Sequence, residues 1–199
     1  MPKLIEKLGN EPITLEEAKV QCYIDPSHYD TDIDIQLSRL ILSARSIAES
    51  RTWQGLRYGK YEHRLRGFPR GEIEIPKPPL HEVEQVTYMT DEGMQTLSSD
   101  LYYVDAHSTP GLIGPVSDWP QALDRPGSVV ITYKGGYLAE ETEEEIHKVI
   151  PENIKAAMLI IIKFLFDHRD ATVPDKATPM NIPRAALDLL DDASSGVVA

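Results

Sequence analysis

Three aspartates alternate along one short stretch and could begin a calcium-binding loop. Asp30, Asp32 and Asp34 occupy alternate positions, as the first ligands of such a loop do. The loop would also need a glycine at Ile35 and a bidentate carboxylate at Ile41, and both positions are apolar. We therefore expect these aspartates to cap a helix and fill its first turn, where negative charge is favourable.

The other chemically capable residue types lack the spacing that a reactive or metal site needs. The six histidines show no i,i+4 or His-x-His pairing, so metal ligation is not predicted. The one cysteine, Cys22, lies in a helical pattern without a histidine or a glycine-rich turn beside it, which favours a buried structural thiol. Gly135-Gly136 lacks the residues that complete a phosphate-binding loop. We predict no catalytic residue, no metal and no cofactor.

Two polar clusters each allow a second interpretation. Asp167-His168-Arg169-Asp170 follows an apolar helix, where His168 and Arg169 suit the negative end of the helix dipole; capping is favoured over catalysis. The basic cluster could meet DNA or an acidic neighbour, but nearby glutamates favour a solvated face. Its members are Lys60, Arg64, Arg66 and Arg70, interspersed with Glu62, Glu72 and Glu74.

The most informative element is a helix expected from about Pro151 to His168. From Ile154 to Phe166 it is apolar on almost every face, whereas an ordinary surface helix keeps one polar face. This helix is therefore central in its own domain or shared with another subunit. Lys155 and Lys163 interrupt a run already shorter than the roughly 20 apolar residues that span a bilayer.

The remaining elements follow from periodicity and turn residues. Thr14 and Glu17 form a capping box before a short helix over residues 15–23, and an amphipathic helix is expected from Asp32 to about Arg51. The first eleven residues have the composition of an arm. Between the helices, β-branched and aromatic runs separated by Gly and Pro predict strands, with a hairpin at Asp91-Glu92-Gly93. The expected strands are Tyr61–Phe68, Glu72–Ile75, Val83–Thr90, Leu101–Asp105, Leu112–Val116 and Ser128–Tyr133.

This order predicts an α+β fold in which N- and C-terminal helices pack together and an antiparallel β-rich region is inserted between them. We divide the chain into the first helices (residues 1–52), the β-rich insertion (53–137), an acidic connector with the apolar helix (138–170) and a C-terminal tail (171–199). The tail contains Pro174, Pro179 and Pro183 and then an amphipathic segment, Arg184 to Leu190. It is either a docking arm or a helix that folds back onto its own domain.

Composition limits the classes of function. The formal net charge of −12 argues against a protein that wraps nucleic acid by neutralising phosphates. It suits either solubility alone, which charge by itself favours, or a surface past which DNA slides. A single cysteine excludes an internal disulfide and fits a reducing cytoplasm. The start, Met-Pro-Lys-Leu-Ile-Glu-Lys, lacks the apolar segment of a signal peptide.

Read in order, residues 12–170 resemble the head–tail connector (adaptor) proteins of long-tailed bacteriophages and prophages, in particular the longer members described as uncharacterised phage proteins. Each matching segment alone is common in many folds, but their order and spacing are specific. The stretch Glu140 to His147 departs from the family by lengthening the acidic connector. The matching segments are Pro12-Ile-Thr-Leu-Glu-Glu-Ala-Lys19, the helix Asp34 to Glu49, Leu65-Arg-Gly-Phe-Pro69, Trp119-Pro120, Val130-Ile-Thr-Tyr-Lys-Gly-Gly-Tyr137, Ile150-Pro-Glu-Asn-Ile-Lys-Ala-Ala157 and Phe166-Asp-His-Arg-Asp170.

The resemblance implies a structural virion protein without enzymatic activity. Such adaptors form a ring, commonly dodecameric, beneath the portal, and they link the DNA-filled capsid to the head-closure or tail-completion protein. Double-stranded DNA would pass through without sequence-specific binding, and no membrane is involved. The protein would be assembled in the bacterial host cytoplasm and reside in the virion neck.

The candidate residues fall into two sets. Core and subunit-interface positions are Ile33, Leu37, Leu40, Ile41, Ile154, Met158, Ile161 and Leu165. Portal-docking positions in the tail are Met180, Ile182, Leu187, Leu189 and Leu190. Two alternatives stay open: a head-closure protein of the same neck, and a small enzyme whose site is assembled from scattered Asp and His residues, which an ordered polar pocket around Asp167 and His168 would favour.

Overall fold

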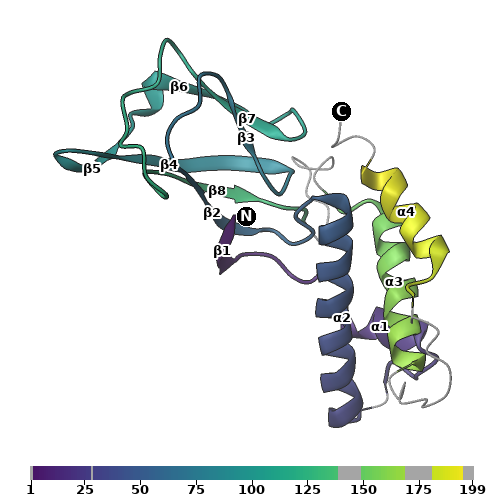
Figure 1. Ribbon diagram of the computed structural model, residues 1–199. Coiled ribbons are helices and arrows are strands. Elements are labelled where there is room, and N and C mark those ends of the chain that lie inside the picture. The colour runs from purple at the N-terminus through teal and green to yellow at the C-terminus, as the bar shows by residue number, and fades with distance from the viewer. Residues whose placement is uncertain (1, 28, 139–148, 169–180, 195–199) are drawn as a thin grey trace. The chain divides into compact units, whose positions relative to one another are not determined.

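The computed structural model describes residues 2–27, 29–138, 149–168 and 181–194. The chain divides into two compact units, which Figure 1 shows. Residues 1–10 and 53–148 form one, here called the β unit, and residues 11–52 and 149–199 form the other, the helical unit. The predicted α+β class, with a β-rich insertion between N- and C-terminal helices, is confirmed.

The first two helices of the helical unit begin at the caps that the sequence predicts. Helix α1 (Leu15–Gln21) starts with a capping box: the Thr14 hydroxyl accepts a hydrogen bond from the Glu17 amide at 3.1 Å, and the Glu17 carboxylate accepts one from the Thr14 amide at 2.7 Å. At the start of α2 (Thr31–Thr52), the Asp30 carboxylate accepts from the amides of Asp32 and Ile33. Asp30 is therefore a helix cap.

Helix α3 (Glu152–Asp167) is the centre of the helical unit. It packs against α1, α2 and α4 (Arg184–Ser194), and Figure 1 shows it flanked by α2 and α4. Ile154, Met158 and Ile161 are fully buried there. Because three helices of its own unit cover α3, its apolar composition needs no second subunit.

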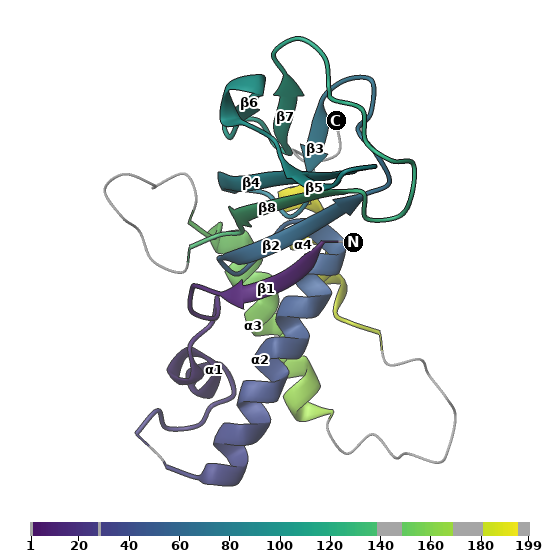
Figure 2. The ribbon, with the colours of Figure 1, turned by 90° about the vertical axis from the view of Figure 1, so that its left-hand side faces the viewer.

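The β unit consists of two antiparallel sheets. The five-stranded sheet has the order β1-β2-β8-β4-β5, and the three-stranded sheet has the order β3-β7-β6. Figure 2 shows the two sheets with β1 and β6 at opposite ends of this unit. The strands are β1 (Lys3–Lys7), β2 (Gly59–Leu65), β3 (Ile73–Ile75), β4 (Leu80–Thr90), β5 (Gly93–Thr96), β6 (Tyr102–Asp105), β7 (Gly111–Pro115) and β8 (Val129–Gly135), with a 3-10 turn, η1 (Ser99–Leu101), before β6.

The two sheets enclose one apolar core. Ile131 and Tyr133 of β8 and Ile113 of β7 are fully buried and belong to a single cluster with the neighbouring strands. Tyr133 stacks on Tyr61 with ring centroids 5.6 Å apart. Its hydroxyl donates to the Pro76 carbonyl at 2.6 Å, which satisfies the buried polar atom.

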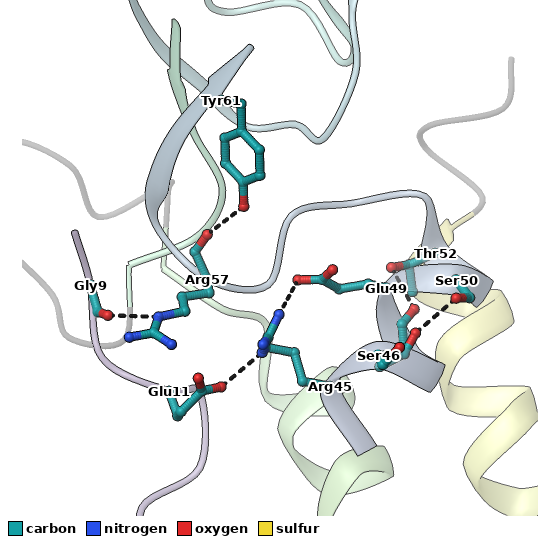
Figure 3. Close-up of polar contacts among 10 residues, drawn as sticks. Gly9, Glu11, Arg45, Ser46, Glu49, Ser50, Thr52, Arg57 and Tyr61 are labelled. Atoms are coloured by element: carbon teal, nitrogen blue, oxygen red, sulfur yellow. Dashed lines mark hydrogen bonds and ion pairs between the residues drawn. The ribbon is translucent and has the colours of Figure 1, made fainter. Parts of the chain in front are cut away.

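Strand β1 corrects the prediction of an N-terminal arm. Lys3–Lys7 pairs antiparallel with β2, and Ile5 is skipped in the register between Leu4 and Glu6. The connection after β1 is held within the β unit, since the Arg57 guanidinium donates to the Gly9 carbonyl at 2.8 Å (Figure 3). The predicted hairpin is confirmed, with β4 and β5 joined at Thr90 and Gly93.

The turn after β8 requires glycine at one position. Gly136 has a φ of 90°, and a Cβ there would lie 2.2 Å from the Arg57 carbonyl oxygen. Gly135 instead continues the strand and pairs with Gly59. The close approach of two backbone segments therefore fixes Gly136 at this turn.

Candidate functional site

Arg45 joins the start of the helical unit to α2. Its Nε atom donates to Glu11 at 2.8 Å and its Nη1 atom to Glu49 at 3.1 Å, and all three side chains are largely buried (Figure 3). A planar guanidinium can hold two carboxylates in fixed directions, which an ammonium group cannot. The arrangement fixes the backbone at Glu11 against the long helix.

A second buried ion pair joins α1 to α2. The Lys19 ammonium lies 2.7 Å from an Asp34 carboxylate oxygen, with the side chains 6% and 18% exposed. Lys19 is the partner that a buried Asp34 needs, because an unpaired charge at this depth is costly. The first-turn aspartate therefore has a tertiary role that the alternating Asp pattern did not reveal.

The eight predicted core and interface residues are distributed between the interior of the helical unit and its half-buried surface. Leu37, Ile41, Ile154, Met158 and Ile161 are buried, and Ile33, Leu40 and Leu165 are half-buried. The buried five are packing residues of this unit. Any contact with a neighbouring subunit by this set is therefore restricted to the half-buried three.

The predicted docking tail forms a helix that packs within its own unit. Helix α4 contacts α2 and α3 through the fully buried Ala186 and Leu190. Leu187, Leu189 and Ile182 are half-buried, and Met180 lies outside the described residues. A bidentate ion pair between Arg51 of α2 and Asp191 of α4 also joins the two helices.

A small hollow lies beside α4. It has a volume of about 290 Å³ and is lined by Ile47 and Leu187 together with the polar side chains Ser46, Ser50 and Arg51. Ser50 donates to the Ser46 carbonyl at 2.8 Å, so this hydroxyl is satisfied inside the helix (Figure 3). The hollow therefore offers the apolar side chains of Ile47 and Leu187 beside one satisfied hydroxyl.

The polar cluster at the end of α3 is occupied with local contacts. The Lys163 ammonium donates to both Asp167 carboxylate oxygens, at 2.6 and 2.7 Å. A ring nitrogen of His168 lies 2.8 Å from the Phe164 carbonyl oxygen, at the negative end of the helix. Both contacts fit the capping interpretation, while Arg169 and Asp170 lie outside the described residues.

The basic cluster around β2 is mostly paired with acids. Arg64 contacts Glu62, Arg66 contacts Asp124 at 2.8 Å, and Lys60 contacts Glu84. The carboxylate of Glu84 also accepts from Lys134, and hydrogen bonds from these two lysines hold the pKa of Glu84 below its usual value. Such pairing reduces the positive field that phosphate recognition would need.

The β unit also has an open groove of about 1180 Å³. Its floor includes Phe68 and Trp119, whose rings stack 4.7 Å apart, and the Trp119 indole donates to the Gly71 carbonyl at 2.8 Å. Arginines and carboxylates also line the groove in mixed order, including the Arg66–Asp124 pair. This mixture presents no reactive constellation.

Across residues 2–27, 29–138, 149–168 and 181–194, no group of three histidine, cysteine or acidic side chains is placed to hold a metal ion. In the same residues no helix combines the length and the apolarity needed to cross a bilayer.

Sequence patterns did not identify the exposed apolar side chains at two sheet edges. They are Ile5 on β1 and Val104 on β6, together with Leu101 just before β6 and Val116 just after β7. The periodicity of a short strand does not say whether the strand will lie at an edge, so no local signal could have found them. Tyr23 and Tyr29, between α1 and α2, are exposed aromatics of the same unpredicted kind.

No protein-family model matches this sequence, and no curated protein matches it. Several solved structures contain chains of similar fold. A chain from the neck of an empty gene transfer agent particle, computed with C6 symmetry, has a TM-score of 0.71 at 14% identity and covers 97% of this chain and 94% of its own.

Two further chains of solved structures are similar in fold to this chain at low sequence identity. One comes from the virion of a native gene transfer agent particle, with a TM-score of 0.69, 14% identity and coverage of 94% and 93%. The other comes from the neck of the native particle computed with C12 symmetry, with a TM-score of 0.63, 15% identity and 94% coverage of both chains. At these identities the likeness establishes a shared fold over nearly the whole chain.

Proposed function

We propose that this chain is a structural virion protein of a phage-like neck: a head–tail connector, or adaptor, that forms a ring beneath the portal and links the DNA-filled capsid to the tail. The observation that carries the proposal is the fold shared with a neck chain over 97% of this sequence. The family resemblance of residues 12–170 points to the same role. The protein would be assembled in the bacterial host cytoplasm and act in the virion.

The symmetry of the similar particles supports a ring. The necks of the gene transfer agent were computed with C6 and C12 symmetry. Closed rings of identical subunits use heterologous contacts, in which two different patches of each copy meet. A dodecameric ring is consistent with both symmetries, since a twelve-fold axis contains a six-fold one.

The C-terminal helix is our candidate for portal contact. Ala186 and Leu190 anchor α4 on α2 and α3, and this leaves the half-buried Leu187 beside the hollow floored by Ile47. An apolar side chain of the portal could enter that hollow and pack against Ile47 and Leu187, where the Ser50 hydroxyl is already hydrogen-bonded. The remaining docking positions, Leu189 and Ile182, would border the contact.

The acidic surface suits a channel for DNA. With a net charge of −12 the chain repels phosphate, so DNA would pass through the ring without binding. Its partners would be the portal above and a head-closure or tail-completion protein below.

The test is native mass spectrometry of the full chain, alone and mixed with the portal protein encoded beside it. A stoichiometric complex with ring symmetry is expected. A chain that stays monomeric in both samples would overturn the adaptor role; binding to the tail-side proteins without the portal would indicate a head-closure protein instead.

The portal contact needs a point substitution, because deleting the tail would remove α4 and uncover buried faces of α3. Leu187→Asp should abolish portal binding while the circular dichroism melting curve stays within a few degrees of wild type. Arg184→Ala, at an exposed position on the same helix, is the matched control and should bind normally. Normal binding by Leu187→Asp would contradict the docking assignment.

A further inference from the structure

Strand β6 ends the three-stranded sheet with one side unpaired. The order β3-β7-β6 gives β6 a single partner strand among the described residues, and the register runs from Tyr102–Pro115 to Asp105–Leu112. The Val116 amide extends this ladder by donating to the Leu101 carbonyl at 3.0 Å. The backbone donors and acceptors on the other side of β6 are available to another strand.

Apolar side chains accompany this free edge. Leu101 is 52% exposed, Val104 39% and Val116 63%, and the bond between Leu101 and Val116 places these two next to each other. Edge strands usually carry a lysine, a proline or a bulge that prevents association. Residues 99–106 contain neither lysine nor proline, and the register of β6 with β7 is regular. The edge is therefore unprotected.

The charges at this edge indicate which sign of charge a pairing strand should carry. Asp100 lies two residues before β6 and Asp105 is its last residue, and residues 99–106 contain no basic residue. A complementary strand should carry net positive charge and an exposed apolar residue.

Strand β1 of a second copy has this pattern. Lys3 and Lys7 are its end residues and are exposed, and Ile5 between them is 49% exposed. Among the described residues β1 is itself an edge strand, with β2 as its one neighbour in the sheet. Its lysines and its bulge oppose pairing with an uncharged edge, whereas the acidic edge of β6 offsets the lysine charges. Ile5 is the bulge residue of the β1–β2 pairing, so no residue of β2 lies opposite it.

We propose that β6 of one copy pairs with β1 of the neighbouring copy, so that the two sheets of adjacent subunits join around the ring. Addition of a strand to an exposed edge is an established mode of association, in which backbone hydrogen bonds provide affinity and side chains provide specificity. The two edges are different patches at opposite ends of the β unit, as Figures 1 and 2 show, so each copy can use both at once. The inference rests on the ring of the proposed function.

Cross-linking tests the pairing directly. Ile5→Cys and Val104→Cys are made in separate full-length chains, which are mixed, assembled with the portal and oxidised. Opposed residues of neighbouring strands lie about 4.5–5.5 Å apart, within disulfide range. We expect an Ile5→Cys/Val104→Cys heterodimer in the ring. The native Cys22 should not compete, because it is buried and burial raises the pKa of its thiol.

A charge substitution gives the second measurement. Val104→Lys should abolish the ring and leave a folded monomer, because it places a cation opposite the apolar Ile5, between the two lysines of β1. Met94→Lys is the matched control, an exposed apolar residue on the edge strand β5, and it should assemble as the wild type does.

The outcomes separate this inference from the proposed function. If the wild-type chain forms no ring with the portal, both fail. If the ring forms but cross-links appear only between two Val104→Cys chains, or Val104→Lys assembles normally, the ring stands and the β6–β1 pairing is overturned.

Discussion

The hydroxyl of Tyr103 donates a hydrogen bond of 2.6 Å to the carboxylate of Glu72. Tyr103 is on β6 and Glu72 immediately precedes β3, so the side chain crosses the middle strand, β7, of the three-stranded sheet. It can do so because Gly114 lies beneath it: a Cβ there would be 2.3 Å from the Tyr103 Cζ and hydroxyl atoms. The Tyr103 side chain thus connects the two edge strands of this sheet and packs over the glycine of the middle strand.

Gly114→Ala should therefore displace Tyr103 and break its bond to Glu72. We expect a loss of about 1–3 kcal/mol in the free energy of unfolding, the usual cost of an added methyl group in a packed site. Tyr103→Phe, which keeps the ring and loses one exposed hydrogen bond, should cost about 0.5–1 kcal/mol. Urea denaturation measures both.

A double substitution tests whether the two residues act together. In a Tyr103→Ala background the ring is absent, so Gly114→Ala should cost much less than it does in the wild type. Equal costs in the two backgrounds would show that the alanine is harmful for a reason unrelated to Tyr103.

The Lys19–Asp34 pair should be strongly coupled. Lys19→Met leaves a largely buried carboxylate without its cation, and the expected loss in the free energy of unfolding is about 3 kcal/mol. The double variant Lys19→Met/Asp34→Leu should be more stable than Lys19→Met alone, because no buried charge remains. Thermal and urea unfolding of the three chains measure the coupling.

The Arg184–Asp188 ion pair is the matched control for the Lys19 and Asp34 variants, since its side chains are 87% and 58% exposed. Arg184→Met should change the free energy of unfolding by about 0.5 kcal/mol or less. A similar small effect for Lys19→Met would mean that the buried pair is solvated in solution.

Most helices and strands could be predicted from local sequence patterns. Those that could not are the ones that form only through contacts with distant parts of the chain. Helix α3 and the hairpin at Gly93 were predictable because period, caps and turn residues lie within a few positions of one another. Strand β1 was not, because Lys3–Lys7 becomes a strand only by pairing with β2, more than fifty residues later. A sequence window contains no information on that partner.

Helix α4 shows the same limit at the level of a single face. The sequence suggested Ala185, Leu187, Leu189 and Leu190 as apolar contacts. Leu190 is fully buried, but the other fully buried residue is Ala186, while Leu187 and Leu189 are half-buried and Ala185 is exposed. An 11-residue helix with apolar residues on adjacent faces can pack in more than one rotation, and contacts with α2 and α3 select one. The candidate docking face could be listed from the sequence, but its orientation could not.

Arg45 should be irreplaceable by lysine. Its guanidinium holds Glu11 and Glu49 through two different nitrogens, and an ammonium group cannot span both directions. Arg45→Lys should lower the free energy of unfolding by about 1–2 kcal/mol, and Arg45→Met by more, because two partly buried carboxylates then repel each other. Arg39→Lys, on the exposed face of the same helix, is the matched control and should be neutral. Equal stability of Arg45→Lys and wild type would contradict a two-partner role.

His63 should make the β unit less stable as the pH falls below neutrality. Burial lowers the pKa of His63 from its ordinary value of 6.5, and among the described residues its Nδ1 atom is buried without a hydrogen-bond partner. Below about pH 6.5 the unfolded chain therefore binds a proton that the folded chain resists, so stability is intact above that pH and falls towards the lowered pKa. Allowing for partial exposure, we expect a loss of about 0.5–1 kcal/mol between pH 7.5 and pH 5.

The difference between wild type and His63→Leu isolates this effect, because every other titrating group is common to both chains. Urea midpoints measured from pH 7.5 to pH 5 should fall less steeply for His63→Leu than for wild type. His107→Gln, which removes an exposed histidine from a loop of the same unit, should keep the wild-type slope. If the urea midpoints of wild type and His63→Leu fall in parallel with pH, His63 takes up its proton equally in the folded and the unfolded chain. The inward position of this residue on β2 would then have no consequence for acid stability.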